Sequence, residues 1–314
     1  MTESKDEQSG ESSKNSSSKY MKIPIEVKAR PYLILAPSLI VTIGILYPFV
    51  LAIIYSLTNY SFRSQTYHFI GLQNWVDMFS KREFWHAALV TSEYALASTG
   101  SELILGLGIA LLLNRDSWYT RVLRVLLIFP LMVAPVIAVL IWQLMTNNAV
   151  GILEKLLNLF GLFNFPWASS AKTALFTAVV IDFWVYCPFV IILARAGLQS
   201  LPKSPFEAAK IDGGSAWFTF KTITLPMLKP ILYIAVIFRL MASLQEFTII
   251  YGLTKGGPGN TLMNLSITAY NTGFAFMRFG KSLPYILFLW LLIYIISQRL
   301  VKNWLAVQKA ASGY

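Results

Sequence analysis

The chain has 314 residues, of which 56% are hydrophobic and 13% are charged, and its formal net charge is +11. Soluble domains carry about a quarter charged residues, so this composition excludes an ordinary soluble domain and predicts a polytopic membrane protein. A single cysteine, Cys187, excludes a disulfide framework, and only two histidines, His68 and His86, argue against a metal site. We expect no nucleic-acid partner, because the basic residues gather on one side of the predicted topology.

The first 22 residues are rich in Ser, Glu, Lys and Asp and show no apolar periodicity. This composition predicts a disordered cytoplasmic tail. No signal-peptide apolar region precedes the first long apolar run, so we expect that run to remain as a membrane anchor.

Six apolar runs approach the length of about 20 residues that is needed to cross the hydrocarbon core. The predicted spans are roughly 32–57, 87–113, 125–145, 173–194, 230–251 and 282–298. Each is expected to be a helix, because the polar backbone must be satisfied within the segment in a bilayer. Pro130 and Pro135 predict a kink in the third span. Between the third and fourth spans, the spacing of Leu and Phe over 153–165 predicts an interfacial helix.

Lys and Arg in the connecting segments predict the orientation. With a cytoplasmic amino terminus, 17 of them lie inside and eight outside. This bias predicts that both termini and the segment 205–230 are cytoplasmic.

The segment 205–230 is charged, yet apolar runs flank it on both sides. Glu207-Ala-Ala favours a short helix, and Asp212-Gly213-Gly214 is typical of a turn. An amphipathic element should begin at Ala216 and end at Pro226 and Pro230. A helix, a glycine turn and a second helix between two spans predict a docking surface for a soluble partner.

Ionisable residues inside the predicted spans form a second candidate site, because buried charges in a bilayer face a protein interior or a polar cavity. Arg239, Ser243 and Glu246 follow one another at i, i+4 and i+7, which places them on one helix face. Arg239 either lines a solute path or makes a structural pair with Glu246, Asp182 or another subunit. Glu93 and Glu102 are expected to face subunit contacts or the membrane edge.

Glu207-Ala208-Ala209, then Gly213, then Ile223-Thr-Leu225-Pro226 resembles the EAA loop of ABC-importer permeases. Four further stretches resemble the sugar-type subfamily, which includes the maltose, trehalose and glycerol-phosphate permeases. They are Ala36-Pro37 with Tyr47-Pro48, Phe69 to Trp75, Arg121 to Pro130, and Leu253 to Pro258. The resemblance covers residues from about 30 to about 303.

The resemblance implies an all-α type I importer permease fold with six transmembrane helices over 23–303 and a short cytoplasmic tail over 304–314. It also implies a multi-pass protein of a prokaryotic inner membrane that works with three kinds of partner. These are a second, different permease chain, two cytosolic ATPases that bind ATP and Mg, and an extracytoplasmic solute-binding protein. The chain has no phosphate loop of the G-x-x-x-x-G-K-[ST] kind, so we expect it to be non-catalytic and without its own cofactor.

The resemblance also implies two sets of site residues. Those implied to couple to the ATPase are Glu207, Ala208, Ala209, Asp212, Gly213, Leu225 and Pro226. Those implied to line the substrate path are Tyr186, Phe189, Arg239, Ser243 and Glu246. The implied solute is a carbohydrate. An unpaired Arg239 would favour an anionic one, such as a uronate oligosaccharide or a sugar or glycerol phosphate, whereas a neutralised Arg239 accepts a neutral oligosaccharide equally well.

Three alternatives remain. A proton-coupled secondary transporter would use Glu102, Asp182 and Glu246 and need no ATPase. An ABC permease for a non-sugar solute, such as an amino acid or a metal chelate, would keep the same loop. A membrane-embedded enzyme is the third, but no carboxylate pair, His–Ser arrangement or metal spacing supports it.

Overall fold

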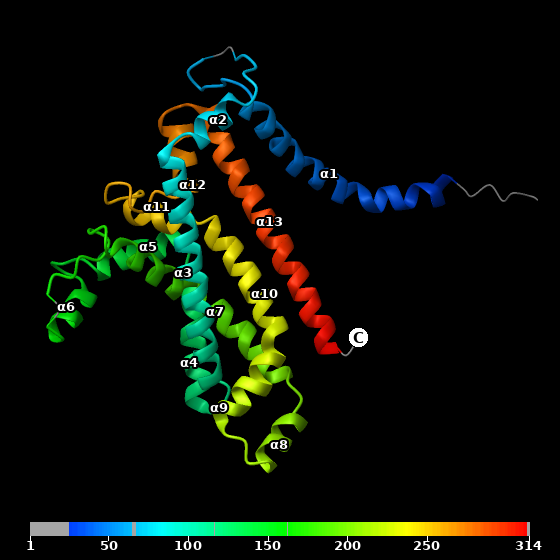
Figure 1. The fold of residues 1–314 in the computed structure, drawn as a ribbon, viewed down its shortest axis with the longest axis vertical. Helices are drawn as coiled ribbons and strands as arrows, with labels where there is room; N and C mark the ends of the chain where they lie inside the picture. Colours follow the sequence, from blue (N-terminus) through cyan, green and yellow to red (C-terminus); the bar gives the residue numbers. More distant parts are fainter. Residues whose placement is uncertain (1–24, 65–66, 116, 162, 313–314) are drawn as a thin grey trace, which may run out of the picture. The chain divides into compact units, whose positions relative to one another are not determined.

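The computed structural model describes residues 25–64, 67–115, 117–161 and 163–312, so the tail predicted at 1–22 lies outside the described residues. These residues form helices joined by loops, and their only strand-like feature is an isolated bridge between Thr58 and Phe69 (Figure 1). The chain divides into two units, residues 1–51 and 52–314. Each unit is described by itself.

The first unit contains most of helix α1 (Ile25–Ser56). Its apolar segment Leu35–Ser56 is long enough to cross a membrane, and side chains 35–51 are exposed or half-buried. Apolar side chains left uncovered on a spanning helix are expected to face lipid or another subunit. The first predicted span is therefore present as a helix.

The second unit is built on four long apolar helices. They are α3 (Arg82–Leu112), α7 (Ala174–Ser200), the continuous helical segment Ala216–Leu244 that ends in α10 (Leu225–Leu244), and α13 (Phe279–Ser312). α3 packs against α7 and α10, and α10 also packs against α13 (Figure 1). Small residues allow these close approaches. Gly197 of α7 has no Cβ, and an added Cβ would lie only 2.8 Å from the Leu228 side chain of α10, which is too close for two carbon atoms. α13 continues without a break through residues 304–312.

The third predicted span is broken rather than kinked. α4 (Trp118–Ile128) and the 3-10 turn Phe129–Met132 meet α5 (Pro135–Met145) at an angle of 106°. Val133 and Ala134 are extended, as a residue before proline prefers to be. Five helices are thus long and apolar enough to span, or six if this bent pair counts as one.

The bounds predicted for the fifth span, 230–251, are wrong at both ends. α9 (Ala216–Thr219) and a π-helical turn (Phe220–Thr224) run directly into α10, so Pro226 and Pro230 do not end the helix. The π turn ends with a bond from Leu225 N–H to Phe220 C=O, and Pro226 follows it in the first turn of α10. The missing N–H of Pro226 is tolerated in a first turn. At the other end, α10 stops at Leu244, and α11 (Thr248–Thr254) is a separate helix.

Short helices cover the end of the unit remote from the segment 205–230 (Figure 1). They are α2 (Gln73–Phe79), α11, and α12 (Leu265–Tyr270) with its π-helical continuation Asn271–Ala275. The Asn74 amide nitrogen donates to the carbonyls of Ser56 and Thr58, each at 2.8 Å, and of Gly280 at 3.3 Å. Asn74 thereby joins the chain after α1 to the start of α13. Of the segment 153–165, predicted as an interfacial helix, residues up to Leu159 are helical, in α6 (Ile152–Leu159).

Candidate functional site

The charged segment folds as a helix, a turn and a second helix. α8 (Ser204–Ile211) begins with a proline in its first turn and carries Glu207 exposed in that turn. Gly213 adopts φ +74°, which favours glycine, and the next amide, Gly214 N–H, donates to Ala209 C=O at 2.8 Å. The turn is thus closed by backbone bonds, and α9 begins at Ala216 with the Ser215 side chain accepting from Phe218 N–H at 3.2 Å.

This loop presents apolar side chains that no other described residue covers. Ile211 is 85% exposed, Trp217 71% and Phe218 55%. A groove of about 860 Å³ lies between the end of α3 and the loop helices, and Arg115, Lys210 and Trp217 contribute to its lining. Exposed aromatic residues beside charged ones mark an interaction surface. The loop is therefore suited to dock a partner.

The other residues implied to couple lie in different surroundings. Ala208 is exposed, whereas Ala209 is buried under the turn. Asp212 is exposed and ends α8. Leu225 packs against the buried cluster that contains Leu228 and Leu232, and Pro226 is exposed on the first turn of α10.

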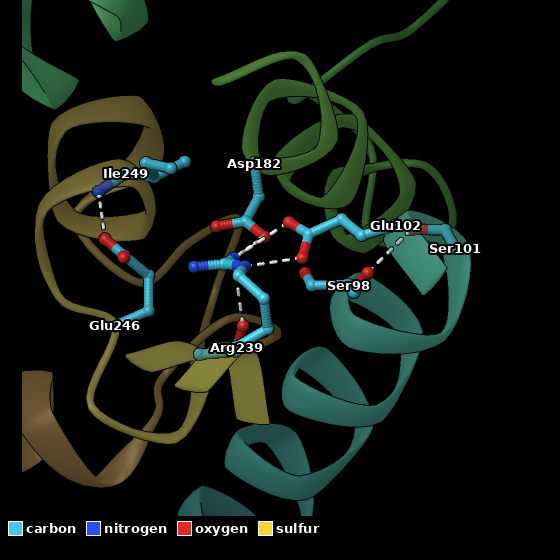
Figure 2. Close-up of polar contacts among 8 residues, drawn as sticks. Ser98, Ser101, Glu102, Asp182, Arg239, Glu246 and Ile249 are labelled. Carbon is cyan, nitrogen blue, oxygen red and sulfur yellow. Dashed lines mark hydrogen bonds and ion pairs between the residues drawn. The ribbon is translucent and has the colours of Figure 1, made fainter. Parts of the chain in front are cut away.

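A buried ionic cluster joins three spanning helices (Figure 2). Arg239 of α10 donates to both carboxylate oxygens of Glu102 on α3, at 2.5 and 2.8 Å. It also donates to Asp182 Oδ2 on α7 at 2.9 Å and to the Ser243 hydroxyl at 3.2 Å. The Arg239 guanidinium carbon lies 4.2 Å from the centre of the Tyr186 ring. One arginine thus connects α3, α7 and α10.

Burial explains why these charges occur together. Glu102 and Asp182 are fully buried and Arg239 is 4% exposed. An unpaired charge in a bilayer is costly, and a buried pair is tolerated when its partners are also hydrogen-bonded. With two carboxylates facing one guanidinium, the cluster carries no net positive charge. Among the described residues, no group of three His, Cys, Asp or Glu could hold a metal ion.

Two expectations about these residues are wrong. Glu102 does not face the membrane edge; it is the main partner of Arg239, from 137 positions earlier in the chain. Glu246 does not pair with Arg239 or share its helix face, because α10 ends at Leu244. Its carboxylate instead accepts the N–H of Ile249 at the start of α11, at 2.7 Å (Figure 2). Glu93 is exposed, and Asp182, one of the proposed partners of Arg239, does pair with it.

Three further side chains lie near these residues and were not predicted from the sequence. Tyr94 and Ser98 precede Glu102 at intervals of four on α3, and their buried hydroxyls have no hydrogen-bond partner among the residues that the structure describes. That spacing on one helix face was the available signal. Phe238, which precedes Arg239, is 56% exposed and makes an edge contact with Phe189, with ring centres 6.2 Å apart.

The chain is similar to permease proteins of known transport systems, both in its family match and in individual relatives. Residues 102–303 match the family described as "Binding-protein-dependent transport system inner membrane component". The trehalose/maltose transport system permease protein MalF of Thermococcus litoralis is 40% identical over 65% of this chain and 69% of its own length. The sulfoquinovosyl glycerol transport system permease protein SmoG of Agrobacterium fabrum is 31% identical over 82% of this chain and 84% of its own length.

One solved structure shows the same fold over nearly the whole chain. It is a bacterial ABC transporter involved in the import of the acidic polysaccharide alginate, with a TM-score of 0.74 and 18% identity, covering 89% of this chain and 96% of that one. At this identity the likeness shows the fold alone, which is the type I importer permease fold. The family match and the fold together show that the chain belongs to the binding-protein-dependent transport system inner membrane components, as a multi-pass permease of an ABC importer.

Proposed function

We propose that this chain is one of two permease subunits of an ATP-driven importer for a neutral oligosaccharide. The observation that carries the proposal is the full neutralisation of Arg239 by Glu102 and Asp182. It bears directly on the choice between an anionic and a neutral solute, which depends on whether that arginine is unpaired.

The proposal that the solute is a carbohydrate is based on the names of similar permeases. The permease of Thermococcus litoralis is named for trehalose and maltose, and that of Agrobacterium fabrum for a sulfoquinovosyl glycerol. The sequence motifs of the sugar-type subfamily, found in order along the chain, support the same class. A sugar solute therefore takes precedence over an amino acid or a metal chelate.

The charge of the solute rests on the ionic cluster. An anionic sugar near Tyr186 would meet a guanidinium already bonded to two carboxylates, so it would find no free positive charge there. A neutral sugar needs only aromatic faces and hydrogen-bond acceptors. Tyr186 and Phe189 would supply the faces, and the half-buried Glu246 would accept from hydroxyl groups. Arg239 and Ser243 would act behind Tyr186 by fixing its position.

Coupling to ATP hydrolysis would pass through α8. Glu207 is exposed and close to uncovered apolar side chains, so it can pair with a basic residue in a cleft of an ATPase subunit. ATP and Mg would be bound by that partner. The exposed Ala208 would allow the close approach, and Gly213 would keep the turn that covers Ala209. Closure of the ATPases would then move α8 and change the side to which the solute path opens.

A proton-coupled transporter is the alternative function. It would use Glu102 and Asp182 as proton carriers, which must exchange partners in each cycle. Both carboxylates are instead fully buried and bonded to Arg239, which argues against this role.

Uptake by the purified complex in proteoliposomes tests the proposal. We expect ATP-dependent uptake of a labelled maltooligosaccharide in the presence of the binding protein, with competition by neutral but not by uronate oligosaccharides. Tyr186→Ala should raise the KM for solute about tenfold while leaving the basal ATP hydrolysis unchanged. The matched control is Tyr294→Ala, an exposed tyrosine on α13. Uptake driven by a proton gradient without ATP, or equal competition by uronates, would contradict the proposal.

A further inference from the structure

A pocket of about 710 Å³ lies at the end of the second unit remote from α8, between α2, the start of α3, the segment 260–278 and the start of α13. Its volume is in the range of sites that hold small molecules. The pocket is separate from the ionic cluster and from the segment 205–230, which we call the coupling loop, and the proposed transport mechanism makes no use of it.

The rim of the pocket is basic. It contains four cations, Lys81, Arg82, Arg278 and Lys281, against two carboxylates, Asp77 and Glu83. Lys281 is engaged, since its ammonium lies 2.9 Å from Asp77 Oδ2. Within the described part of the chain, the other three cations make no ion pair, and all three are exposed. The rim therefore has a surplus of positive charge that is available to an anion.

The interior of the pocket is largely apolar. The buried Met78 and Tyr285, together with Met263 and the exposed Phe276, contribute to its wall. Asn74 also lines the pocket, and the carbonyl oxygen of its side-chain amide is buried with no hydrogen-bond partner in the described part of the chain. A ligand that fits this lining has an anionic group for the rim, an apolar portion for the wall, and a hydroxyl that can donate to Asn74.

Helix length places the rim at the depth of lipid headgroups. The spanning segments Arg82–Leu112 and Phe279–Lys309 each have 31 residues, which is about 46 Å of helix. A bilayer measures about 40–45 Å including its headgroup regions, so the first turns of both helices reach headgroup level. The exposed Trp85 in the first turn of α3 fits this depth, because tryptophan favours the interface.

We propose that this pocket binds an anionic phospholipid of the phosphatidylglycerol type. The phosphate lies between Arg82 and Arg278, the glycerol headgroup reaches Asn74, and the upper acyl chain lies against Phe276 and Met263. An acidic loop of the binding protein would satisfy the rim but would leave the apolar wall without a matching group. Lipid binding at this pocket does not depend on which solute the importer carries.

Native mass spectrometry of the purified complex, released from nanodiscs of equal phosphatidylglycerol and phosphatidylcholine, tests the proposal. Arg82→Gln with Arg278→Gln should weaken phosphatidylglycerol retention about tenfold and leave phosphatidylcholine retention unchanged. The control, Lys155→Gln with Lys172→Gln, removes two exposed charges outside the pocket and should have no effect. Retention of the complete complex in both variants shows that folding is intact. Equal retention in the two variants would overturn the proposal.

Crosslinking separates the lipid from other anions. A benzophenone amino acid in place of Phe276, activated in membranes that also contain the binding protein, should add the mass of one phospholipid. Ten millimolar inorganic phosphate should not reduce this product, because the acyl chain contributes to binding. A crosslink to the binding protein, or displacement of the lipid by free phosphate, would overturn the assignment.

Discussion

The buried ionic cluster and the coupling loop both place charged side chains on helices, but in opposite surroundings. Glu102, Asp182 and Arg239 are at most 4% exposed, and both carboxylates are bonded to Arg239 from other helices. Glu207 and Asp212 are exposed and form no ion pair within the portion of the chain that the structure describes.

Burial accounts for the difference in role. In a bilayer each charge must find its partner within the protein. The charges of the cluster therefore pair across α3, α7 and α10 and stabilise the packing of these helices. At a wet surface a charge is hydrated and contributes little to stability, so it stays free to meet a partner. We therefore expect substitutions in the cluster to affect folding and those in the loop to affect coupling.

The largest expected effect follows from removing Arg239. Arg239→Gln leaves two buried carboxylates without their cation, and loss of one partner of a buried pair costs about 3–5 kcal/mol of unfolding free energy. Thermal unfolding of the purified complex in detergent measures this loss of stability. Arg299→Gln, an exposed arginine on α13, is the matched control and should change little.

A compensating variant tests the reason for this loss. Glu102→Gln combined with Arg239→Gln removes a charge of each sign, so the double variant should be less destabilised than the sum of the single ones. Additive losses would mean that the two residues stabilise the fold separately.

A smaller effect is expected in the turn of the coupling loop. Gly213 has φ +74°, and a residue with a Cβ is disfavoured there by about 1–2 kcal/mol. Gly213→Ala should therefore loosen α8 and speed amide hydrogen exchange over residues 204–211, with the exchange of α7 unchanged. Gly213→Asn is the matched variant, because asparagine tolerates this conformation better. If the amides of residues 204–211 are equally protected from hydrogen exchange in Gly213→Ala and Gly213→Asn, the turn does not support α8.

The smallest effect concerns the half-buried ion pair between Asp77 and Lys281, at the pocket remote from α8. The hydrogen bond from Lys281, with a further one from Gln73, lowers the pKa of Asp77 below its ordinary value of 3.8. A carboxyl with a lowered pKa adds stability above its unfolded-state pKa and loses it as the pH falls through the folded value. Asp77→Asn should therefore cost at most about 1 kcal/mol at pH 7, and nothing near pH 2. A difference in unfolding temperature that is the same at both pH values would contradict this.

The sequence predicted the coupling loop well, because its structure is set locally. Glu207-Ala-Ala forms the helix, and Gly213 and Gly214 form the turn within a few residues. The spans were also found, since apolar length is a local property. Asp182 was correctly considered as a partner of Arg239.

The pairing of the buried charges and the bounds of α10 depend on tertiary contacts and on backbone geometry, which local sequence patterns do not reveal. The pairing of Glu102 with Arg239 spans 137 positions and could not be read from the spacing of either helix. The prediction that Arg239 and Glu246 share a face required α10 to continue beyond Leu244, where it instead ends before α11. Proline favours a helix end at Pro226, but the π turn before it allows the helix to continue.

Intact-complex mass spectrometry of Glu207→Ala tests the division of roles most directly. The loop substitution should keep the permease folded, with its unfolding temperature unchanged, but reduce the number of ATPase subunits retained per complex. Lys229→Ala, an exposed charge on the first turns of α10, should retain the full complement. Full ATPase retention in Glu207→Ala, or a loss that accompanies unfolding of the permease, would contradict the account.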